Sequence, residues 1–441
     1  MPTIFAPITS PLKAGISVIR ISGPATTDCL KILGFKGEPQ HQKISLQKIR
    51  DPKTKKIIDE ALVSFFKSPN SFTGEDIAEI SIHASPFIAK KIFEILLAEK
   101  NCRFAEAGEF SKRAFLNNKL DLVQTEAIPD LIAAETEAQH RQALLQLEGK
   151  LGQIYEDWRF RLIEISAMLE AAIDFPDEDL PKNIINKVEE DVEKLSAEIL
   201  SHLDDKKIGQ KIKSGLNLAI IGAPNVGKSS LINFLAQSEI AIVSEIAGTT
   251  RDVIEVHLEI AGVAVKISDT AGIHETNDKI EAEGIRRALK KAKEADLKIF
   301  LVDAVNPVLR QDLIDENTIL VMNKIDLVES VNTNVAKKES SKEFLQISLT
   351  NNIKTRELIK KLEEKILSMI PNQTSPLITQ ERYRVALKNA AENLENFNLA
   401  KNIELAAEDL RIAAREIGKI TGKVDVENIL DVIFSRFCIG K

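Results

Sequence analysis

Residues 222–229 read G-A-P-N-V-G-K-S and follow an apolar run at residues 216–221, so a glycine-rich loop stands where a strand should pass into a helix. The backbone N–H groups of such a loop, together with the positive end of the following helix, bind nucleotide phosphates. Lys228 can reach the terminal phosphates, and the hydroxyl of Ser229 can bind Mg²⁺. Because the strand precedes the glycines, we predict a phosphate-binding loop rather than a chance turn.

Three more polar segments follow along the chain, each after an apolar run that predicts a strand. Asp269 opens a D-T-A-G segment, which offers a carboxylate for a metal ion and a glycine N–H for a γ-phosphate. Residues 323–326 read N-K-I-D, and Asp326 can accept both N–H groups on one edge of guanine, a donor pair that adenine lacks. Ser348 follows the run at residues 344–347. Four loops at the carboxyl ends of strands predict a GTP site at the edge of a parallel sheet.

The residues predicted to bind GTP come from these loops and from a glycine-led segment at residues 248–252 that suits a mobile switch. They are Asn225, Val226, Gly227, Lys228, Ser229, Ser230, Ser244, Glu245, Ile246, Ala247, Gly248, Thr249, Thr250, Asp269, Thr270, Ala271, Gly272, Asn323, Lys324, Asp326, Ser348, Leu349 and Thr350. Ser229 and Thr250 are the predicted Mg²⁺ ligands. Asn225 places a side-chain carbonyl inside the phosphate loop, where it can bind a monovalent cation beside the β- and γ-phosphates.

The residue that orients the attacking water is not the usual one. Many small GTPases have a glutamine directly after the D-x-x-G glycine, but here that position holds Ile273, which cannot hydrogen-bond water. Glu281 is the candidate catalytic residue, acting through a bridging water, and Glu275 and Glu283 compete for the role. The alternative for Glu281 is a solvated helix carboxylate. Arg251 can be an internal arginine finger or, more simply, a surface ion pair.

The length and composition of the chain limit the number of domains, the cellular location and the kinds of partner that we expect. A chain of 441 residues is long enough for several domains. No apolar run approaches the roughly 20 residues of a membrane helix, and no signal peptide is recognisable, so we expect a cytoplasmic protein. Cys29, Cys102 and Cys438 are too few for a disulfide framework or a zinc cluster. The net charge of −7 gives no chain-wide attraction for nucleic acid, so RNA binding must be local or supplied by a partner.

The chain is expected to form an α+β domain (1–118), a helical domain in two parts (119–213 and 371–441) and an α/β GTPase domain (214–370) inserted between those parts. The first domain has predicted strands at residues 3–8, 16–22, 61–66 and 77–82 and a helix near 87–99. In the helical domain an apolar stripe favours a bundle core over a partner groove, with Gly149 and Gly152 interrupting the helices. The stripe consists of Leu144, Leu147, Leu151, Ile154, Trp158, Leu162, Ile165 and Leu169.

Four features together resemble the MnmE (TrmE) family of bacterial and organellar tRNA modification GTPases over essentially the full length. They are the inserted GTPase domain, G-T-T-R-D at residues 248–252, G-E-F-S-K-R-A-F-L-N-N-K-L-D at residues 108–121 and C-I-G-K at residues 438–441. F-P-D-E at residues 175–178 is similar to the family's linker. The resemblance implies an aminomethyltransferase-like N-terminal domain, a helical bundle and an inserted Ras-like P-loop GTPase domain.

The resemblance also implies cofactors. The N-terminal domain would pair with its copy in a homodimer and bind 5-formyltetrahydrofolate or methylenetetrahydrofolate, with Arg20, Glu79, Lys119 and Lys441 as contacts. The GTPase domains would dimerise with K⁺, for which Asn225, Ser244, Ile246 and Thr249 are the implied ligands. One departure is H-A-S at residues 83–85, where the family usually has H-G-G, so the adjoining pocket wall can differ.

The implied function is the addition of an aminomethyl-type or carboxymethylaminomethyl group to C5 of the wobble uridine of certain tRNAs, together with the NADH-using flavoprotein MnmG in a heterotetramer. Lys441 and Cys438 are expected to serve this modification chemistry, although a partly buried, unreactive thiol is the simpler interpretation of Cys438. A ribosome-assembly GTPase that acts as an RNA-binding switch is the alternative, and a folate enzyme complete in itself is a third. The basic run at residues 286–293 is expected to be a solvated helix face rather than an RNA site.

Overall fold

The structure is a computed structural model that describes residues 1–10, 14–174, 182–238, 256–268, 290–328, 343–371, 375–400, 402–424, 427–435, 437–438 and 440. The chain forms two compact units, each built from separated stretches of sequence. One unit contains residues 1–129, 146–196 and 389–441, and the other contains residues 130–145 and 197–388.

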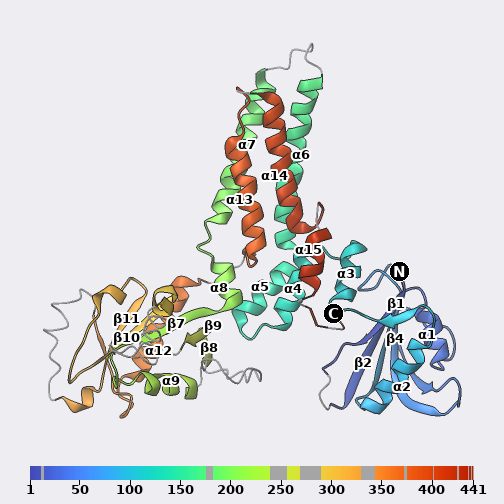
Figure 1. The fold of residues 1–441 in the computed structure, drawn as a ribbon, viewed down its shortest axis with the longest axis horizontal. Helices are drawn as coiled ribbons and strands as arrows, with labels where there is room; N and C mark the ends of the chain where they lie inside the picture. Colours follow the sequence, from blue (N-terminus) through green and yellow to red (C-terminus); the bar gives the residue numbers. More distant parts are fainter. Residues whose placement is uncertain are drawn as a thin grey trace, which may run out of the picture. The chain divides into compact units, whose positions relative to one another are not determined.

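The N-terminal residues fold into a six-stranded sheet with helices α1 (Thr26–Ile32) and α2 (Pro86–Leu97), labelled in Figure 1. Its strands, in the spatial order β3-β4-β5-β2-β1-β6, are β3 (Lys43–Arg50), β4 (Ile57–Phe66), β5 (Ile77–His83), β2 (Ile16–Ser22), β1 (Thr3–Pro7) and β6 (Cys102–Phe104). The expected strands and the helix α2 are confirmed. Helix α1 and strands β3 and β6 were not predicted, although β3 alternates polar and apolar residues over residues 43–47, a pattern typical of a strand. Strand β6 is only three residues long, too short for such a pattern.

The two faces of this sheet differ in character. One face packs Ile19, Val63 and Ile80 against Leu30 of α1 and Ile92 of α2, and these side chains form a buried core. On the other face, apolar side chains of β3 and β4 remain 70%, 65% and 47% exposed, at Ile44, Leu46 and Leu62, respectively. Side chains alternate between the faces along a strand, so this open face also carries the side chains of β2 and β5 that the sequence analysis singled out.

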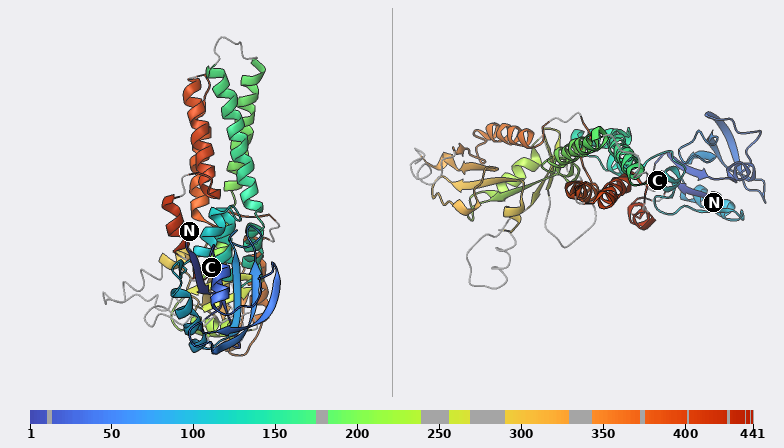
Figure 2. Two further views of the ribbon diagram at one scale, coloured as in Figure 1. Left: turned by 90° about the vertical axis from the view of Figure 1, so that its right-hand side faces the viewer. Right: turned by 90° about the horizontal axis from the view of Figure 1, so that it is seen from above.

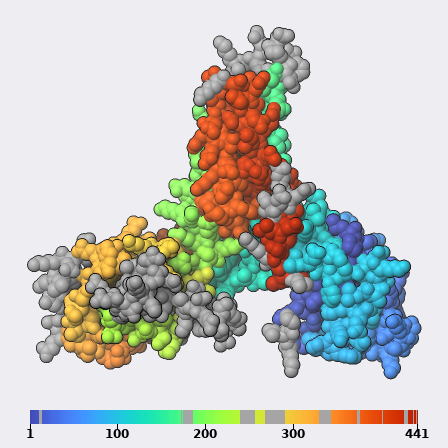
Figure 3. All heavy atoms as spheres, in the orientation of Figure 1, coloured from blue at the N-terminus to red at the C-terminus, as the bar shows by residue number. Residues whose placement is uncertain are grey.

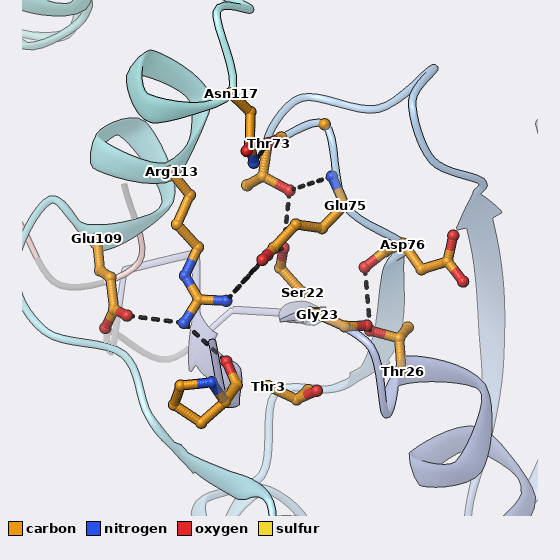
Figure 4. A network of polar contacts seen from close by, with 12 residues as sticks. Thr3, Ser22, Gly23, Thr26, Thr73, Glu75, Asp76, Glu109, Arg113 and Asn117 are labelled. Carbon is orange, nitrogen blue, oxygen red and sulfur yellow. Dashed lines mark hydrogen bonds and ion pairs between the residues drawn. The ribbon is translucent and has the colours of Figure 1, made fainter.

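A buried polar network joins the sheet to helix α3 (Glu109–Leu116), as Figure 4 shows. Arg113 is 1% exposed, and its guanidinium donates to both carboxylate oxygens of Glu75 at 2.9 and 3.1 Å and to Glu109 at 2.8 Å. The Ser22 hydroxyl donates to Glu75 at 2.8 Å and therefore accepts from Thr73, also at 2.8 Å. A buried arginine held by two carboxylates fixes the loop before β5 against α3.

Helix α4 (Leu122–Ile132) begins with a capping box in which Asp121 is the N-cap. The Gln124 N–H donates to Asp121 Oδ1 at 2.6 Å, and the Asp121 N–H donates to Gln124 Oε1 at 2.9 Å. Asp121 also lies against Gly152, where an added Cβ would come within 2.1 Å of Oδ2. Burial raises the pKa of the Asp121 carboxyl to about 6. The cap is therefore a desolvated acid that requires a glycine beside it.

Gly149, with a φ of 80°, separates α5 (Glu137–Leu147) from α6 (Lys150–Asp174) as expected, but the expectation that Gly152 also interrupts a helix is wrong. Gly152 lies inside α6. The stripe residues Leu151, Trp158, Leu162, Ile165 and Leu169 are buried, which confirms the bundle-core interpretation for them. Among the described residues, no helix combines the length and the apolar character needed to cross a membrane.

Helix α6 packs against α14 (Ile403–Thr421), and the two run side by side in Figures 1 and 2. In the space-filling view the red side chains of α14 cover much of α6 (Figure 3). Helices α7 (Lys182–Leu203) and α13 (Glu381–Asn396) complete the bundle, as Figure 1 shows, and α15 (Glu427–Phe434) follows α14 along the chain. Phe434, Phe437 and Leu430 pack with Leu122 and Phe115, so α15 is attached to α3 and the start of α4.

The second sheet lies in the other unit and has the order β12-β11-β10-β7-β9-β8. Its strands are β7 (Leu216–Ile221), β8 (Val256–Ile260), β9 (Val263–Ser268), β10 (Leu297–Asp303), β11 (Thr318–Asn323) and β12 (Leu345–Gln346). Only the β8–β9 pair is antiparallel among these described strands. Helices α9 (Lys228–Gln237) and α12 (Thr355–Met369) accompany the sheet, which confirms the predicted α/β class.

The incoming and outgoing connections of this α/β region lie together. Arg384 of α13 donates to the Leu203 carbonyl at 2.8 Å and to Asp205 at 2.5 Å, and both charged side chains are buried. Gly209 of α8 (Ile208–Ser214) is so close to the Ile378 carbonyl that an added Cβ would lie 2.5 Å from it. The juxtaposition of residues 203–209 with residues 378–384 is the geometry that an inserted domain requires.

Asp121 should give the protein a measurable pH dependence. Its folded-state pKa of about 6 lies above the ordinary 3.8, so its contribution to stability is present below that ordinary value and is lost as the pH rises through about 6. Relative to the wild type, Asp121→Asn should therefore gain on the order of 1–3 kcal/mol of stability between about pH 4 and pH 8. Thermal midpoints of both proteins across this range test the prediction. A difference that does not change with pH would contradict it.

Candidate functional site

The predicted phosphate loop joins β7 to α9 directly. Gly222 and Gly227 have φ values of 153° and 103°. An added Cβ would lie 2.2 Å from the Leu301 carbonyl oxygen at Gly222 and 2.5 Å from Asn323 Nδ2 at Gly227. Both positions therefore require glycine, for their backbone conformation and for the close approach of neighbouring strands. The loop ends at the N-terminus of a ten-residue helix, where backbone donors favour a phosphate group.

Lys228 spans this loop. Its Nζ donates to the carbonyl of Gly222 at 3.0 Å and to that of Ala223 at 2.8 Å. Ser229 and Ser230 follow in the first turn of α9, and both are exposed. The structure therefore places the ammonium group and the hydroxyl groups of the motif at the same end of the helix, as phosphate and Mg²⁺ binding require.

Asn323 holds three loops together. This residue is only 4% exposed, and its Nδ2 donates to the Val226 carbonyl in the phosphate loop at 2.9 Å. Its Oδ1 accepts from the Leu349 N–H at 3.1 Å. Ser348 is fully buried, and its hydroxyl accepts from the Asn351 N–H at 3.2 Å. One buried amide thus connects the guanine loop with the phosphate loop and with the fourth loop, which the sequence analysis placed at the same sheet edge.

The other described residues of the guanine loop also lie at this edge. Lys324 has a φ of 64°, and its Nζ donates to the Asn225 carbonyl at 2.6 Å. Asp326 lies in the short 3-10 helix Ile325–Leu327 and is exposed, so its carboxylate is accessible to a base. Thr350 follows Leu349 and is exposed as well.

Several predicted site residues lie outside the described residues. These are Ser244, Glu245, Ile246, Ala247, Gly248, Thr249, Thr250, Arg251, Asp269, Thr270, Ala271, Gly272, Ile273, Glu275, Glu281, Glu283 and Lys441. The strands next to two of these segments are described: β8 begins at Val256, and β9 ends at Ser268, directly before Asp269. Because β9 pairs in parallel with β7, the carboxyl ends of both strands point toward the same edge of the sheet.

A second cluster lies on the open face of the N-terminal sheet. Arg20 and Glu79 are paired across β2 and β5, and the guanidinium donates to Glu79 Oε1 through Nε at 2.9 Å and Nη2 at 2.8 Å. Phe72 and Phe110 have ring centroids 5.4 and 5.5 Å from the guanidinium carbon. Neither ring was predicted to belong to this site, although Phe110 belongs to the motif at residues 108–121.

Lys119 lies beside the loop that carries Phe72. Its Nζ donates to the Pro69 carbonyl at 3.0 Å, and its aliphatic chain would lie 3.4 Å from a Cβ added at Gly74. The Lys119 side chain is exposed and is therefore accessible to a ligand. Lys119 and Arg20 therefore border the same loop, at Pro69 and at Phe72, respectively.

The C-terminal motif packs on the same domain. The Gly108 N–H donates to the Cys438 carbonyl at 3.5 Å, and a Cβ added at Gly440 would lie 2.3 Å from the Pro7 carbonyl oxygen. Pro7 belongs to β1, whose neighbouring residue Ala6 pairs with Arg20. The described tail residues therefore lie next to the strand pair that carries Arg20. Cys438 is exposed, so the interpretation of a partly buried thiol is wrong.

The H-A-S segment is accommodated without glycine. Neither Ala84 nor Ser85 has a positive φ, and Ser85 is the extended N-cap of α2. His83 is held by Asp59, whose Oδ1 lies 2.8 Å from Nδ1 and whose Oδ2 accepts the His83 N–H at 2.9 Å. The departure at residues 83–85 therefore imposes no backbone strain on the end of β5.

Two family models match the chain. One, described as the MnmE helical domain, matches residues 122–438, and the other, described as the GTP-binding protein TrmE N-terminus, matches residues 3–119. The chain is 48% identical over 447 residues to proteins from Rickettsia akari and Rickettsia canadensis, both named tRNA modification GTPase MnmE. Each alignment covers 100% of this chain and 100% of the relative.

Among solved structures, the chain is similar to an Aquifex aeolicus Era variant crystallised with GDP and aluminium fluoride. The sequence identity is 26%, and the TM-score is 0.29. The match covers 40% of this chain and 66% of that one.

Replacing Asn323 should weaken the whole sheet edge. Asn323→Ala leaves the buried Val226 carbonyl and Leu349 N–H without their partner, so we expect a loss of roughly 1–3 kcal/mol in the stability of the α/β domain and weaker GDP binding. Asn317→Ala, just before the same strand, is the control because no hydrogen bond of its side chain is found in the described part of the chain. Thermal unfolding and fluorescent-GDP titration measure both effects. Equal values for the two variants would contradict the prediction.

Proposed function

The chain belongs to the MnmE family of tRNA modification GTPases, and from this premise we propose that it is a K⁺-stimulated GTPase that acts on the wobble uridine of certain tRNAs. The observation that supports the GTPase activity is the Asn323 side chain, which joins the phosphate loop to the guanine loop at one edge of a parallel sheet. The proposed partner is the flavoprotein MnmG, with which the chain would add an aminomethyl or carboxymethylaminomethyl group to C5 of the uridine.

Guanine selection is assigned to Asp326. Its exposed carboxylate follows Lys324 on a short, fixed turn and can accept the two adjacent N–H groups of guanine. A site that holds such a donor pair rejects adenine, because the carboxylate would then lose both hydrogen bonds. Ser348, Leu349 and Thr350 form the neighbouring loop, which Asn323 attaches to this turn.

The described residues fit the expected cations. The Ser229 hydroxyl lies in the first turn of α9, where it would bind Mg²⁺ together with Thr250. Asn225 is exposed, has a φ of 57°, and no hydrogen bond of its side chain is found among the described residues. Its amide oxygen would bind K⁺ together with Ser244, Ile246 and Thr249, since carbonyl oxygens suit this ion. The cation would supply positive charge beside the β- and γ-phosphates.

Glu281 is proposed to orient the attacking water, because Ile273 replaces the usual glutamine. A residue that acts mainly in the transition state affects turnover and not affinity. Glu281→Ala should therefore lower GTP turnover and leave nucleotide affinity nearly unchanged. Wild-type turnover in this variant, measured with K⁺ present, would transfer the role to Glu275 or Glu283.

The open face of the N-terminal sheet is proposed to bind the folate and a second copy of the chain. Exposed Ile44, Leu46 and Leu62 form an apolar surface of the kind that protein interfaces cover. Arg20 and Glu79 lie on the same face, where a cation and a carboxylate suit the oxygens and the N–H donors of a reduced folate. Lys119 and Lys441 would complete the contacts, and Cys438 would serve the one-carbon chemistry.

Hydrolysis should depend on K⁺ rather than on a separate activating protein. We expect GTP turnover to fall sharply when Na⁺ replaces K⁺, because the smaller ion suits the same carbonyl ligands less well. Asn225→Ala should lose the response to K⁺, whereas the control Asn317→Ala should keep it. Steady-state phosphate release in the two salts measures this. Equal wild-type rates in both salts would show that the proposal is wrong.

The described tail residues lie beside the Arg20 strands, which leads to a separable prediction. In a deletion strain, the full chain should restore modified wobble uridines, as detected by mass spectrometry of tRNA. A chain that ends at Phe437 should not restore them, and it should bind folate more weakly because it lacks the tail. Its K⁺-stimulated GTP turnover should survive. Intact tRNA modification together with lost GTP turnover would show that the tail serves GTP hydrolysis and not the modification chemistry.

A further inference from the structure

Asp303 ends strand β10, next to β11 and its guanine loop and, on the other side, next to β7 and its phosphate loop. Its Oδ2 lies 2.7 Å from the Lys324 Nζ, and its Oδ1 accepts the Val305 N–H at 2.9 Å. Partial burial alone would raise the pKa of Asp303, but Lys324 and the Val305 amide hold this pKa below its usual value. The carboxylate is thus ionised at neutral pH and bonded on both oxygens.

Lys324 connects this carboxylate to the phosphate loop. The same Nζ donates to the Asn225 carbonyl at 2.6 Å, so a single ammonium group joins β10 to the loop. Lys324 and Asn225 have φ values of 64° and 57°. The Lys324 ammonium group is held from two sides, by a charge-assisted bond to Asp303 and by the Asn225 carbonyl, and the bond to the carboxylate is the stronger of the two.

We propose that Asp303 is a positioning residue for GTP hydrolysis: it holds Lys324 against the Asn225 carbonyl and thereby fixes the backbone from which the Asn225 side chain extends. The inference rests on the proposed function, because Asn225 is the described member of the K⁺ ligand set. Asp303 acts through Lys324 and the loop. Replacing it should therefore change the K⁺ concentration that hydrolysis requires, and should not remove a group that takes part in the reaction itself.

An ion pair that only stabilises the domain is the competing explanation, and the chain offers a matched comparison. Lys298, near the other end of β10, forms an ion pair with Asp315 at 2.6 Å. Both ion pairs have one member on β10 and similar N–O distances, 2.6 and 2.7 Å, but only the Asp303 pair touches the phosphate loop. Asp315→Asn is therefore the control for Asp303→Asn, and Asp303→Glu tests whether the charge is what matters.

Three quantities should be measured on the full-length variants. The first is the K⁺ concentration for half-maximal GTP turnover, which Asp303→Asn should raise roughly tenfold because one charge-assisted hydrogen bond is weakened. The second is the rate of GDP dissociation in Na⁺ buffer without K⁺, which should increase. The third is hydrogen exchange of the backbone amides at residues 222–228, which should become faster. Asp303→Glu, which keeps the negative charge, should change each of the three quantities less than Asp303→Asn does. Asp315→Asn should leave all three at wild-type values.

The outcomes separate this inference from the function on which it rests. If the wild type shows no response to K⁺, the proposed function fails, while GDP dissociation and hydrogen exchange still test the link from Asp303 to the loop. If the wild type responds to K⁺ and Asp303→Asn matches it in all three measurements, the inference is overturned. Equal effects of Asp303→Asn and Asp315→Asn would also overturn it, because general destabilisation would then explain both.

Discussion

The nucleotide site depends on one buried amide. Asn323 has a donor and an acceptor at fixed geometry, and it uses them on two loops that are 97 and 26 residues away in sequence. Because the amide is shielded from water, each unmade bond would carry the full desolvation cost. The phosphate loop therefore cannot separate from the guanine loop without exposing or breaking this contact. Gly227 is part of the same constraint, since any Cβ there would displace the Asn323 amide group.

In the N-terminal domain, a buried charged side chain, and not a neutral amide, holds separate segments together. Arg113 is almost fully buried, and its terminal guanidinium nitrogens bind Glu75, Glu109 and the Pro2 carbonyl, whereas its Nε has no hydrogen-bond partner among the described residues. Burial alone would raise the pKa of Glu109, but Arg103, the Glu106 amide and Arg113 hold this pKa below its usual value. Removing one acid would leave part of the buried guanidinium unpaired, and removing both would leave a buried cation without compensation, which is far more costly than losing a surface pair. This network, drawn in Figure 4, holds Thr73 and Glu75. The same loop carries Phe72, whose ring lies 5.4 Å from the Arg20 guanidinium carbon.

Sequence reasoning succeeded where the signal is local. The phosphate loop, its flanking strand and helix, and the N-K-I-D turn follow from residues within a single short stretch, and the structure confirms the described strands and helices. It failed where a partner is distant: Arg113 gains its role from Glu75 and the Pro2 carbonyl, and Gly152 is a packing site for Asp121 and not a helix break. Asp303 had a usable signal, a carboxylate at the end of an apolar strand, but its partner Lys324 was recognisable only from the sheet order. Helical periodicity identified the buried face of α6, because that face repeats along the sequence.

The two connections of the α/β region are tied to each other by a buried contact. Asp205 and Arg384 form an ion pair that joins the incoming segment to the outgoing one, and the Leu203 carbonyl accepts from the same guanidinium. Within the described part of the chain, Arg384 Nε and Asp205 Oδ2 have no hydrogen-bond partner, which lowers the stability that the pair contributes. A movement of one connection must therefore either move the other or expose these buried charges. The two connecting segments of the GTPase region are therefore coupled to each other through the contact between Asp205 and Arg384.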